Sequence, residues 1–236
     1  MAESRRRNRT DSTGNAVILE TAAQCFMEQG FSTTSIDDVA RRMDSTKGRI
    51  YHYYSSKTDL FFDVHREGMA RLFNAVEPAM ITKGSALHRL QEMLMAHALA
   101  MMNNVAFEAV VVQGVHMHKL AATTPDQRRT LNELISIRRR FEALFKQVIR
   151  DGIDDGSIRD VDVSIAAKAV LGAINWLSIG YQPRSAETEN DKIALAKEIV
   201  GIQINGLRAS RMATTAQTML PCIITADTDA CESAKP

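Results

Sequence analysis

The feature that most constrains the fold is a pair of short helical segments separated by a tight break at Asp44 and Ser45. Apolar residues recur at a helical spacing in the first segment, at Ile36, Val39, Ala40 and Met43. Thr34 or Ser35 offers an N-cap for it, and the second segment spans about residues 46–53. A longer helical pattern precedes the pair. Two short helices with a third packed across them form the arrangement that places one helix in a DNA major groove.

The rest of the chain also has helical periodicity, with few residues that break helices. Only five of its 236 residues are proline, and no stretch alternates as a strand does between turn signals. Further helices are expected at about 57–81, 85–103, 105–120, 126–153, 162–181 and 188–209. We therefore predict an all-α protein, with an N-terminal three-helix helix-turn-helix domain for binding DNA and a C-terminal helical bundle. Ligand binding and dimerisation are expected of that bundle from the resemblance and the residue patterns given below.

Composition shifts divide the chain into four parts. Residues 1–12 are rich in arginine and are expected to be a flexible basic arm. We expect residues 13–60 to form the helix-turn-helix domain. We expect residues 61–211 to form the ligand-binding and dimerisation domain, with roles that rest on the resemblance and the residue patterns given below. Residues 212–236 are rich in Thr, Ala and Ser, and we expect a disordered tail there.

Bulk properties and missing motifs exclude several classes of protein. The net charge of +1 excludes a general binder of polyanions, so any affinity for DNA must come from local charge. Three scattered cysteines favour a reducing cytoplasm, and no apolar run is long enough to indicate a membrane partner. His116 and His118 lie on different helical faces, so we expect no metal. No motif for catalysis or a cofactor is present, so we expect no enzyme and no catalytic residue.

The second short segment carries side chains suited to DNA. Ile50 and Tyr54 are four residues apart and can both face the core. The remaining surface then carries Lys47, Arg49, Tyr51, His52 and Tyr53. Between residues 41 and 57 there are five basic residues and one acid. Such cations neutralise phosphates, and tyrosine offers a hydroxyl to a phosphate and a ring face to a thymine methyl group. An aromatic core stripe is the alternative, but four consecutive rings point around most of a helix and cannot all be buried.

Three strings in this region resemble the N-terminal signature of the TetR family of transcriptional regulators. They are the residues from Gly30 to Ala40, then Lys47-Gly48 with Tyr51-His52-Tyr53-Tyr54, then Ser56-Lys57-Thr58-Asp59-Leu60. The resemblance implies phosphate contacts for Thr34, Tyr53 and Lys57, and places Lys47 to His52 in the groove. The candidate DNA-binding residues are thus Thr34, Ser35, Thr46, Lys47, Gly48, Arg49, Tyr51, His52, Tyr53 and Lys57.

Three positions depart from that signature. Asp44 stands where the family usually has glycine, which aspartate can replace in a left-handed turn at some cost. Ser45 replaces a small apolar residue, and Tyr54 replaces a phenylalanine.

The last two helices are apolar enough to form a dimer interface. Apolar residues are dense in both, at Ala166, Ala169, Val170, Ala173, Ile174 and Leu177, then at Ile199, Val200, Ile202, Ile204 and Leu207. Two adjacent apolar helices at the end of a domain suit a four-helix bundle with a second copy. The alternative is that both helices belong only to the internal core.

Two patterns point to a ligand pocket. The helix at 85–103 is rich in methionine, with His97 and Met101 on its apolar stripe, although methionine also fills ordinary cores. Arg138 falls on the apolar face of the helix at 126–153 and needs an anionic or hydrogen-bonding partner. That partner is either a buried group such as Glu108 or a carboxylate or phosphate of a ligand.

The segment from Leu171 to Trp176, followed by Gly180-Tyr181-Gln182-Pro183, resembles a TetR branch that senses acyl-CoA thioesters. Gly180 departs from that branch, which often has a second aromatic residue there. The candidate ligand-binding residues are His97, Met101, Arg138, Asn175 and Trp176. The ligand is a CoA thioester or a hydrophobic drug-like or steroid-like molecule.

The expected function is a cytoplasmic repressor that binds a double-stranded DNA operator as a homodimer and is released by a small-molecule effector. Two alternatives stay open, namely a helical DNA-packaging protein without an effector and a repressor of efflux genes that senses xenobiotics. A helical lipid carrier or an enzyme would instead show no affinity for DNA.

Overall fold

The computed structural model describes residues 2–120 and 124–209, and within those ranges every regular element is a helix. The helices are α1 (Ala2–Gln29), α2 (Ile36–Arg42), α3 (Lys47–Tyr51), α4 (Lys57–Met80), α5 (Ala86–Asn103), α6 (Val105–Leu120), α7 (Pro125–Asp154), α8 (Val163–Asn175), α9 (Leu177–Gly180) and α10 (Glu189–Leu207). In the described part of the chain, only one isolated bridge, between Ile158 and Arg208, has β geometry. The all-α prediction is confirmed.

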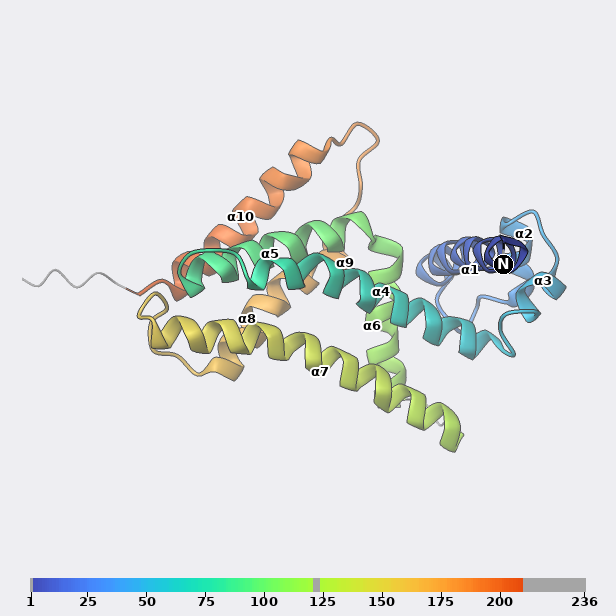
Figure 1. Cartoon of the computed structure of the whole chain (residues 1–236), viewed down its shortest axis with the longest axis horizontal. Coiled ribbons are helices and arrows are strands. Elements are labelled where there is room, and N and C mark those ends of the chain that lie inside the picture. Colours follow the sequence, from blue (N-terminus) through green and yellow to red (C-terminus); the bar gives the residue numbers. More distant parts are fainter. Residues whose placement is uncertain (1, 121–123, 210–236) are drawn as a thin grey trace, which may run out of the picture.

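The molecule is elongated, and α4 joins its two ends (Figure 1). The helices α1, α2 and α3 cluster at one end, and α5, α7, α8 and α10 form the other. The helix α6 runs across the long axis between them, because the chain bends by 99° between α5 and α6. This placement puts α6 between the two groups of helices.

Helix boundaries agree with the sequence expectations to within a few residues, except at two places. The helix expected at 162–181 is broken at Trp176 into α8 and α9. At the break, the Ser178 hydroxyl donates to the Asn175 carbonyl at 2.7 Å, and the Ile179 amide bonds instead to the Trp176 carbonyl at 3.0 Å. A side chain has taken the place of one backbone bond, which tightens the turn.

The second difference is at the N-terminus. The first helix begins at Ala2, so it includes residues that the sequence analysis assigned to a flexible arm. The segment has no proline, and one glycine inside a helix costs only about 1 kcal/mol relative to alanine, so a continuous helix is physically allowed. The predicted tail at 212–236 lies outside the described residues.

The two ends of the molecule share packing through α6 and α7. The core around α1–α3 includes Phe26, Val39 and Ile50. It also contains residues of α6 and α7, namely Phe107, Val110, Leu131 and Leu134. A second core joins α4, α5, α7, α8 and α10. The N-terminal helices therefore pack directly against helices that also build the C-terminal bundle.

The helices α4 and α6 cross at very short range. A Cβ atom added to Gly114 would lie 2.6 Å from His65 Cδ2, and one added to Gly68 would lie 2.9 Å from Val111 Cγ2. Glycine is required at both positions because a larger residue would force the helices apart. The two helices must therefore move together.

Candidate DNA-binding surface and effector cavity

The helix α3 presents to solvent most of the side chains that its sequence assigned to DNA. Ile50 and Tyr54 are buried, at 0% and 5% exposed, as predicted. Thr46, Lys47, Gly48, Arg49, Tyr51 and His52 are exposed, and Tyr53 is partly buried. Thr46 occupies the N-cap position without a capping bond from its side chain, so its hydroxyl is available to a phosphate.

The turn before α3 depends on a strained backbone at Asp44. Its φ of 49° is the one positive value at a non-glycine residue in the described chain, which agrees with the left-handed turn expected there. The Ser45 amide then bonds to the Ala40 carbonyl at 2.9 Å, which fixes the angle between α2 and α3. Ser35, at the start of α2, is exposed, and its hydroxyl forms a capping box with Asp38.

Thr34 and Lys57, both predicted to contact phosphates, have hydrogen-bond partners within the chain. The Thr34 side chain is buried, and its hydroxyl bonds to the Gly30 and Cys25 carbonyls at 2.8 and 3.1 Å. The Lys57 ammonium group donates to the carbonyls of Phe31, Ser32 and Thr34 at 2.7, 3.3 and 2.7 Å. All three of its N–H groups have partners, so Lys57 ties α4 to the α1–α2 turn. Both side chains hold the α1–α2 turn in shape, and their contacts with phosphates stay a prediction.

Most of the other basic residues in this segment form surface ion pairs. The Arg42 guanidinium donates two hydrogen bonds to the Glu28 carboxylate, at 2.5 and 2.8 Å. Arg41 forms an ion pair with Asp38 at 3.1 Å, and the Lys47 ammonium group lies 3.7 Å from the Asp37 carboxylate. Arg49 is exposed, and no carboxylate of the described residues lies within 4.0 Å of it. Exposed pairs contribute only about 0–1 kcal/mol each, so phosphates can replace their acidic partners at small cost.

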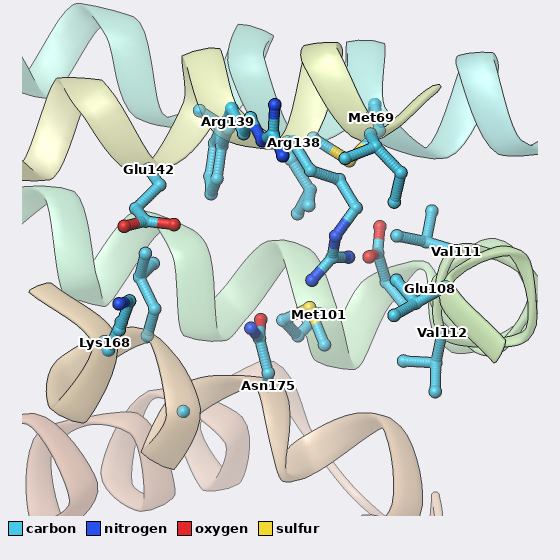
Figure 2. A pocket seen from close by; sticks show the side chains of 16 residues that line it. Met69, Met101, Glu108, Val111, Val112, Arg138, Arg139, Glu142, Lys168 and Asn175 are labelled. Atoms are coloured by element: carbon cyan, nitrogen blue, oxygen red, sulfur yellow. The ribbon is translucent and has the colours of Figure 1, made fainter. Parts of the chain in front are cut away.

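A cavity of about 320 Å³ lies in the C-terminal bundle, enclosed by α4, α5, α6, α7 and α8 (Figure 2). Apolar side chains form most of its wall: Met69, Leu72, Met101, Val111, Val112, Val115, Ile135, Phe141 and Leu171. Glu108, Arg138, Arg139, Glu142, Lys168 and Asn175 add polar groups. A mostly apolar wall with a few converging polar groups is typical of a small-molecule site.

Three of the five predicted ligand residues line this cavity, namely Met101, Arg138 and Asn175. His97 does not, because it is fully buried against the rings of Phe141 and Phe145, at centroid distances of 5.2 and 5.9 Å. Trp176 does not either, because the break between α8 and α9 turns it outward and leaves it 64% exposed. Its indole covers Gly180, where an added Cβ atom would lie 2.8 Å from Nε1. This contact explains why no second aromatic residue is found at position 180.

The contribution of α6 to the cavity was not predicted from the sequence. Glu108 was expected only as an ion-pair partner of Arg138, and Val111, Val112 and Val115 were not expected in the wall. Those valines show no signal beyond ordinary apolar periodicity, so only the tertiary fold identifies them.

Buried groups around Arg138 have strongly shifted pKa values. Burial raises the pKa of Glu108 to about 8, although Arg138 and Arg71 oppose the shift. Burial and the charge of Arg138 lower the pKa values of His65 and His97 to about 3, so both rings are neutral at pH 7. Both nitrogens of each ring, and Glu108 Oε1, lack a hydrogen-bond partner. The residues described contain no cluster of His, Cys, Asp and Glu that could hold a metal ion.

The cavity wall is connected directly to the DNA-binding helices through Gln113 on α6. Its Nε2 donates to the Phe26 carbonyl at 2.9 Å, and its Oε1 accepts from the Phe31 amide at 3.2 Å. Val112 and Val115, on either side of it along α6, line the cavity. One helix therefore contacts both the cavity and the turn between α1 and α2.

The family is shown by two matches along the chain. Residues 18–64 match the family of bacterial regulatory proteins of the tetR type, and residues 83–206 match the tetracyclin repressor-like C-terminal domain. The chain belongs to the TetR family. The family is not enzymatic, and its members bind DNA operators through the helix-turn-helix that α2 and α3 form here. The resemblance to the TetR family that residues 30–60 indicated is confirmed.

Relatives support a regulator of transcription. The chain is 22% identical over 201 residues to the transcriptional repressor KstR2 of Mycolicibacterium smegmatis, covering 82% of this chain and 90% of that one. It is 21% identical over 193 residues to a fatty acid metabolism regulator protein of Bacillus subtilis, covering 80% and 93%. AibR, solved with isovaleryl coenzyme A and operator DNA, shares the fold with a TM-score of 0.65 and 22% identity, covering 83% of this chain and 98% of AibR.

The first prediction separates the structural role of Lys57 from that of the residues predicted to face DNA. Lys57→Met should lower the free energy of unfolding by about 2 kcal/mol, because three carbonyls lose a charged donor. Lys47→Met, the matched control with only a long exposed pair, should leave it unchanged. Arg49→Ala should leave stability unchanged but alter which sequences are selected from a randomised DNA pool. Urea unfolding without DNA measures stability, and equal stability of the two lysine variants would contradict the assignment of Lys57.

The second prediction concerns the buried carboxyl group. Glu108 stays neutral in the folded protein up to about pH 8, whereas it ionises above pH 4.5 in the unfolded chain. Its burial therefore lowers stability progressively as pH rises from 4.5 to 8. Glu108→Gln removes this loss, so its stability relative to the parent should rise by on the order of 3 kcal/mol between pH 5 and pH 8. Urea unfolding across this range tests it, and a flat difference would show that the pKa is not raised.

Proposed function

We propose that this protein is a cytoplasmic transcriptional repressor that leaves its operator when a small molecule occupies the cavity. The observation that carries the proposal is the double role of α6, which lines the cavity with Val111, Val112 and Val115 and bonds to the α1–α2 turn through Gln113. A ligand that changes the position of α6 changes the position of the DNA-binding helices.

The close crossing at Gly68 and Gly114 extends this coupling to α4. Arg71 on α4 adds a further tie, because it bonds to Glu20 on α1 at 2.6 Å and to Asn104 at the start of α6 at 3.0 Å. A shift of α6 is therefore passed to both α1 and α4. The ligand can shift this equilibrium only by the difference between its affinities for the two arrangements.

The effector class that we favour is an acyl-CoA thioester. A cavity of about 320 Å³ with an apolar wall suits an acyl group, while Arg139 and Lys168 offer positive charge for phosphates. The sequence from Leu171 to Trp176 and the ligand of AibR support the same class. A hydrophobic drug-like or steroid-like ligand is the second candidate, supported by the nine apolar residues of the wall.

We further propose a homodimer formed through α8 and α10. Ile165, Trp176, Ile179 and Ile202, on or beside these helices, are 62–75% exposed. The helix α8 is apolar on its outer face as well as its buried face, which is typical of a helix covered on both sides. Gly201 and Gly206 on α10 have open space around them in this chain, so no internal contact requires glycine at either position. We propose that these glycines allow a second copy of the chain to approach α10 closely.

The third prediction tests the function with operator DNA. A DNase footprint on the DNA that flanks the gene should cover a pseudo-palindrome whose half-sites lie about one helical turn, roughly 34–36 Å, or a multiple of it apart. Acyl-CoA thioesters should reduce the operator affinity at least tenfold, and free CoA should not. Uniform coating of DNA at all sequences would support the packaging alternative and overturn the proposal. Release by hydrophobic drugs alone would favour the second effector class.

The route through α6 is tested in the same assay with Gln113→Leu. The variant keeps the size of the side chain but loses both hydrogen bonds to the α1–α2 turn. It should bind the thioester with the affinity of the parent while the thioester reduces its operator affinity by a smaller factor. An unchanged factor would show that Gln113 is not on the route.

The fourth prediction tests the interface. The parent should sediment at twice the chain mass at micromolar concentration. Ile202→Arg should convert it to a monomer, because a charge cannot be buried in an apolar interface without a partner. Ile81→Arg is the matched control, since Ile81 is 86% exposed at the end of α4, outside α8 and α10. If both variants sediment as the parent does, the interface lies elsewhere.

A further inference from the structure

Most of the buried polar groups without a partner lie around Arg138, and one of them, Glu108, lines the cavity. Six buried side-chain atoms in the described chain lack a hydrogen-bond partner, and five of them belong to His65, His97 and Glu108. Arg138, from the facing helix α7, acts electrostatically on all three. Buried polar groups in proteins are almost always satisfied, so the unsatisfied Glu108 carboxyl group in the cavity wall marks a place for a bound group.

The geometry around Glu108 favours an anion. Figure 2 shows the Arg138 guanidinium and the Glu108 carboxyl group pointing toward each other across the cavity, with the Asn175 amide beside them. No carboxylate of the described residues lies within 4.0 Å of the Arg138 guanidinium, so its fork of donors is open to a ligand. Glu142, the other acid in the wall, is paired with Lys146 at 2.6 Å.

We propose that Arg138, Asn175 and Glu108 bind the carboxylate group of an amphipathic organic acid whose apolar part fills the rest of the cavity. Arg138 offers two parallel N–H donors, which match the two oxygens of a carboxylate. Asn175 offers an amide N–H, and Glu108 in its neutral form donates its O–H. This inference rests on the proposed effector cavity but not on the thioester class. An acyl-CoA thioester has no carboxylate at its acyl end, so the organic acid is a further ligand of the same cavity.

The protonation of Glu108 makes the site sensitive to pH. An ionised Glu108 would compete with the ligand for Arg138, whereas a neutral one donates to it. The titratable and charged groups around this pair come from every helix of the wall, namely Arg71 and His65 on α4, His97 on α5, Arg138 and Glu142 on α7, and Lys168 on α8. Both histidines are neutral above pH 6. Glu108 is therefore the member of this group that changes charge near pH 8.

The fifth prediction uses octanoate and octanamide, which have the same length and differ in charge. Isothermal titration at pH 7 with the full chain should show at least tenfold tighter binding of octanoate. Arg138→Met should weaken octanoate at least tenfold and leave octanamide unchanged. Arg140→Met, an exposed arginine two residues along α7 and outside the cavity wall, is the matched control and should bind octanoate as the parent does.

Octanoate binding measured across a pH series is the second test of the carboxylate site. Octanoate affinity of the parent should fall between pH 7 and pH 9, and Glu108→Gln should remove that fall because its amide cannot ionise. The comparison of octanoate with octanamide uses the unsubstituted protein, so it does not depend on whether any variant folds. Equal affinity for the two probes, or no octanoate binding at millimolar concentration, overturns the carboxylate site. Octanoate binding that leaves operator affinity unchanged would support the carboxylate site and count against the effector role of the cavity.

Discussion

The close crossing of α4 and α6 is the constraint on which the rest of the structure depends. With the His65 ring against Gly114 and the Val111 side chain against Gly68, the two helices pack with no room for a Cβ atom at either glycine. This contact holds α6 across the molecule, where one side of it faces the cavity and the other carries Gln113 to the α1–α2 turn. A wider crossing would separate α6 from α1 and enlarge the cavity, so the geometry of both sites follows from one helix packing.

The DNA-binding surface could be predicted from the sequence because its determinants are local. Helical spacing placed Ile50 and Tyr54 inward, and the left-handed turn at Asp44 followed from the residue types that tolerate it. The intramolecular partners of Thr34 and Lys57 could not be predicted, for a tertiary reason. Their partners are the carbonyls of the α1–α2 turn, and the sequence does not show that this turn lies within reach of the start of α4.

The cavity could be predicted only in part, because its wall comes from five helices whose relative positions depend on packing. Met101 and Arg138 were found from their place on an apolar stripe, and Asn175 from a motif. The contribution of α6 was missed, since a run of valines has the same pattern in a cavity wall as in a solid core. Trp176 was misplaced because a single hydroxyl, that of Ser178, breaks the helix beside it. Local periodicity cannot show a break of that kind.

The unsatisfied groups around Arg138 bear on the size of any response. A buried polar group without a partner costs about 1–3 kcal/mol, so a ligand that satisfies the Glu108 carboxyl group removes an unfavourable term. A tenfold change in affinity corresponds to about 1.4 kcal/mol. One charge-assisted hydrogen bond that forms in one arrangement of α6 and not in the other is therefore enough for a tenfold change in operator affinity. A response of that size needs no large rearrangement, because α6 joins the cavity to the α1–α2 turn without an intervening element.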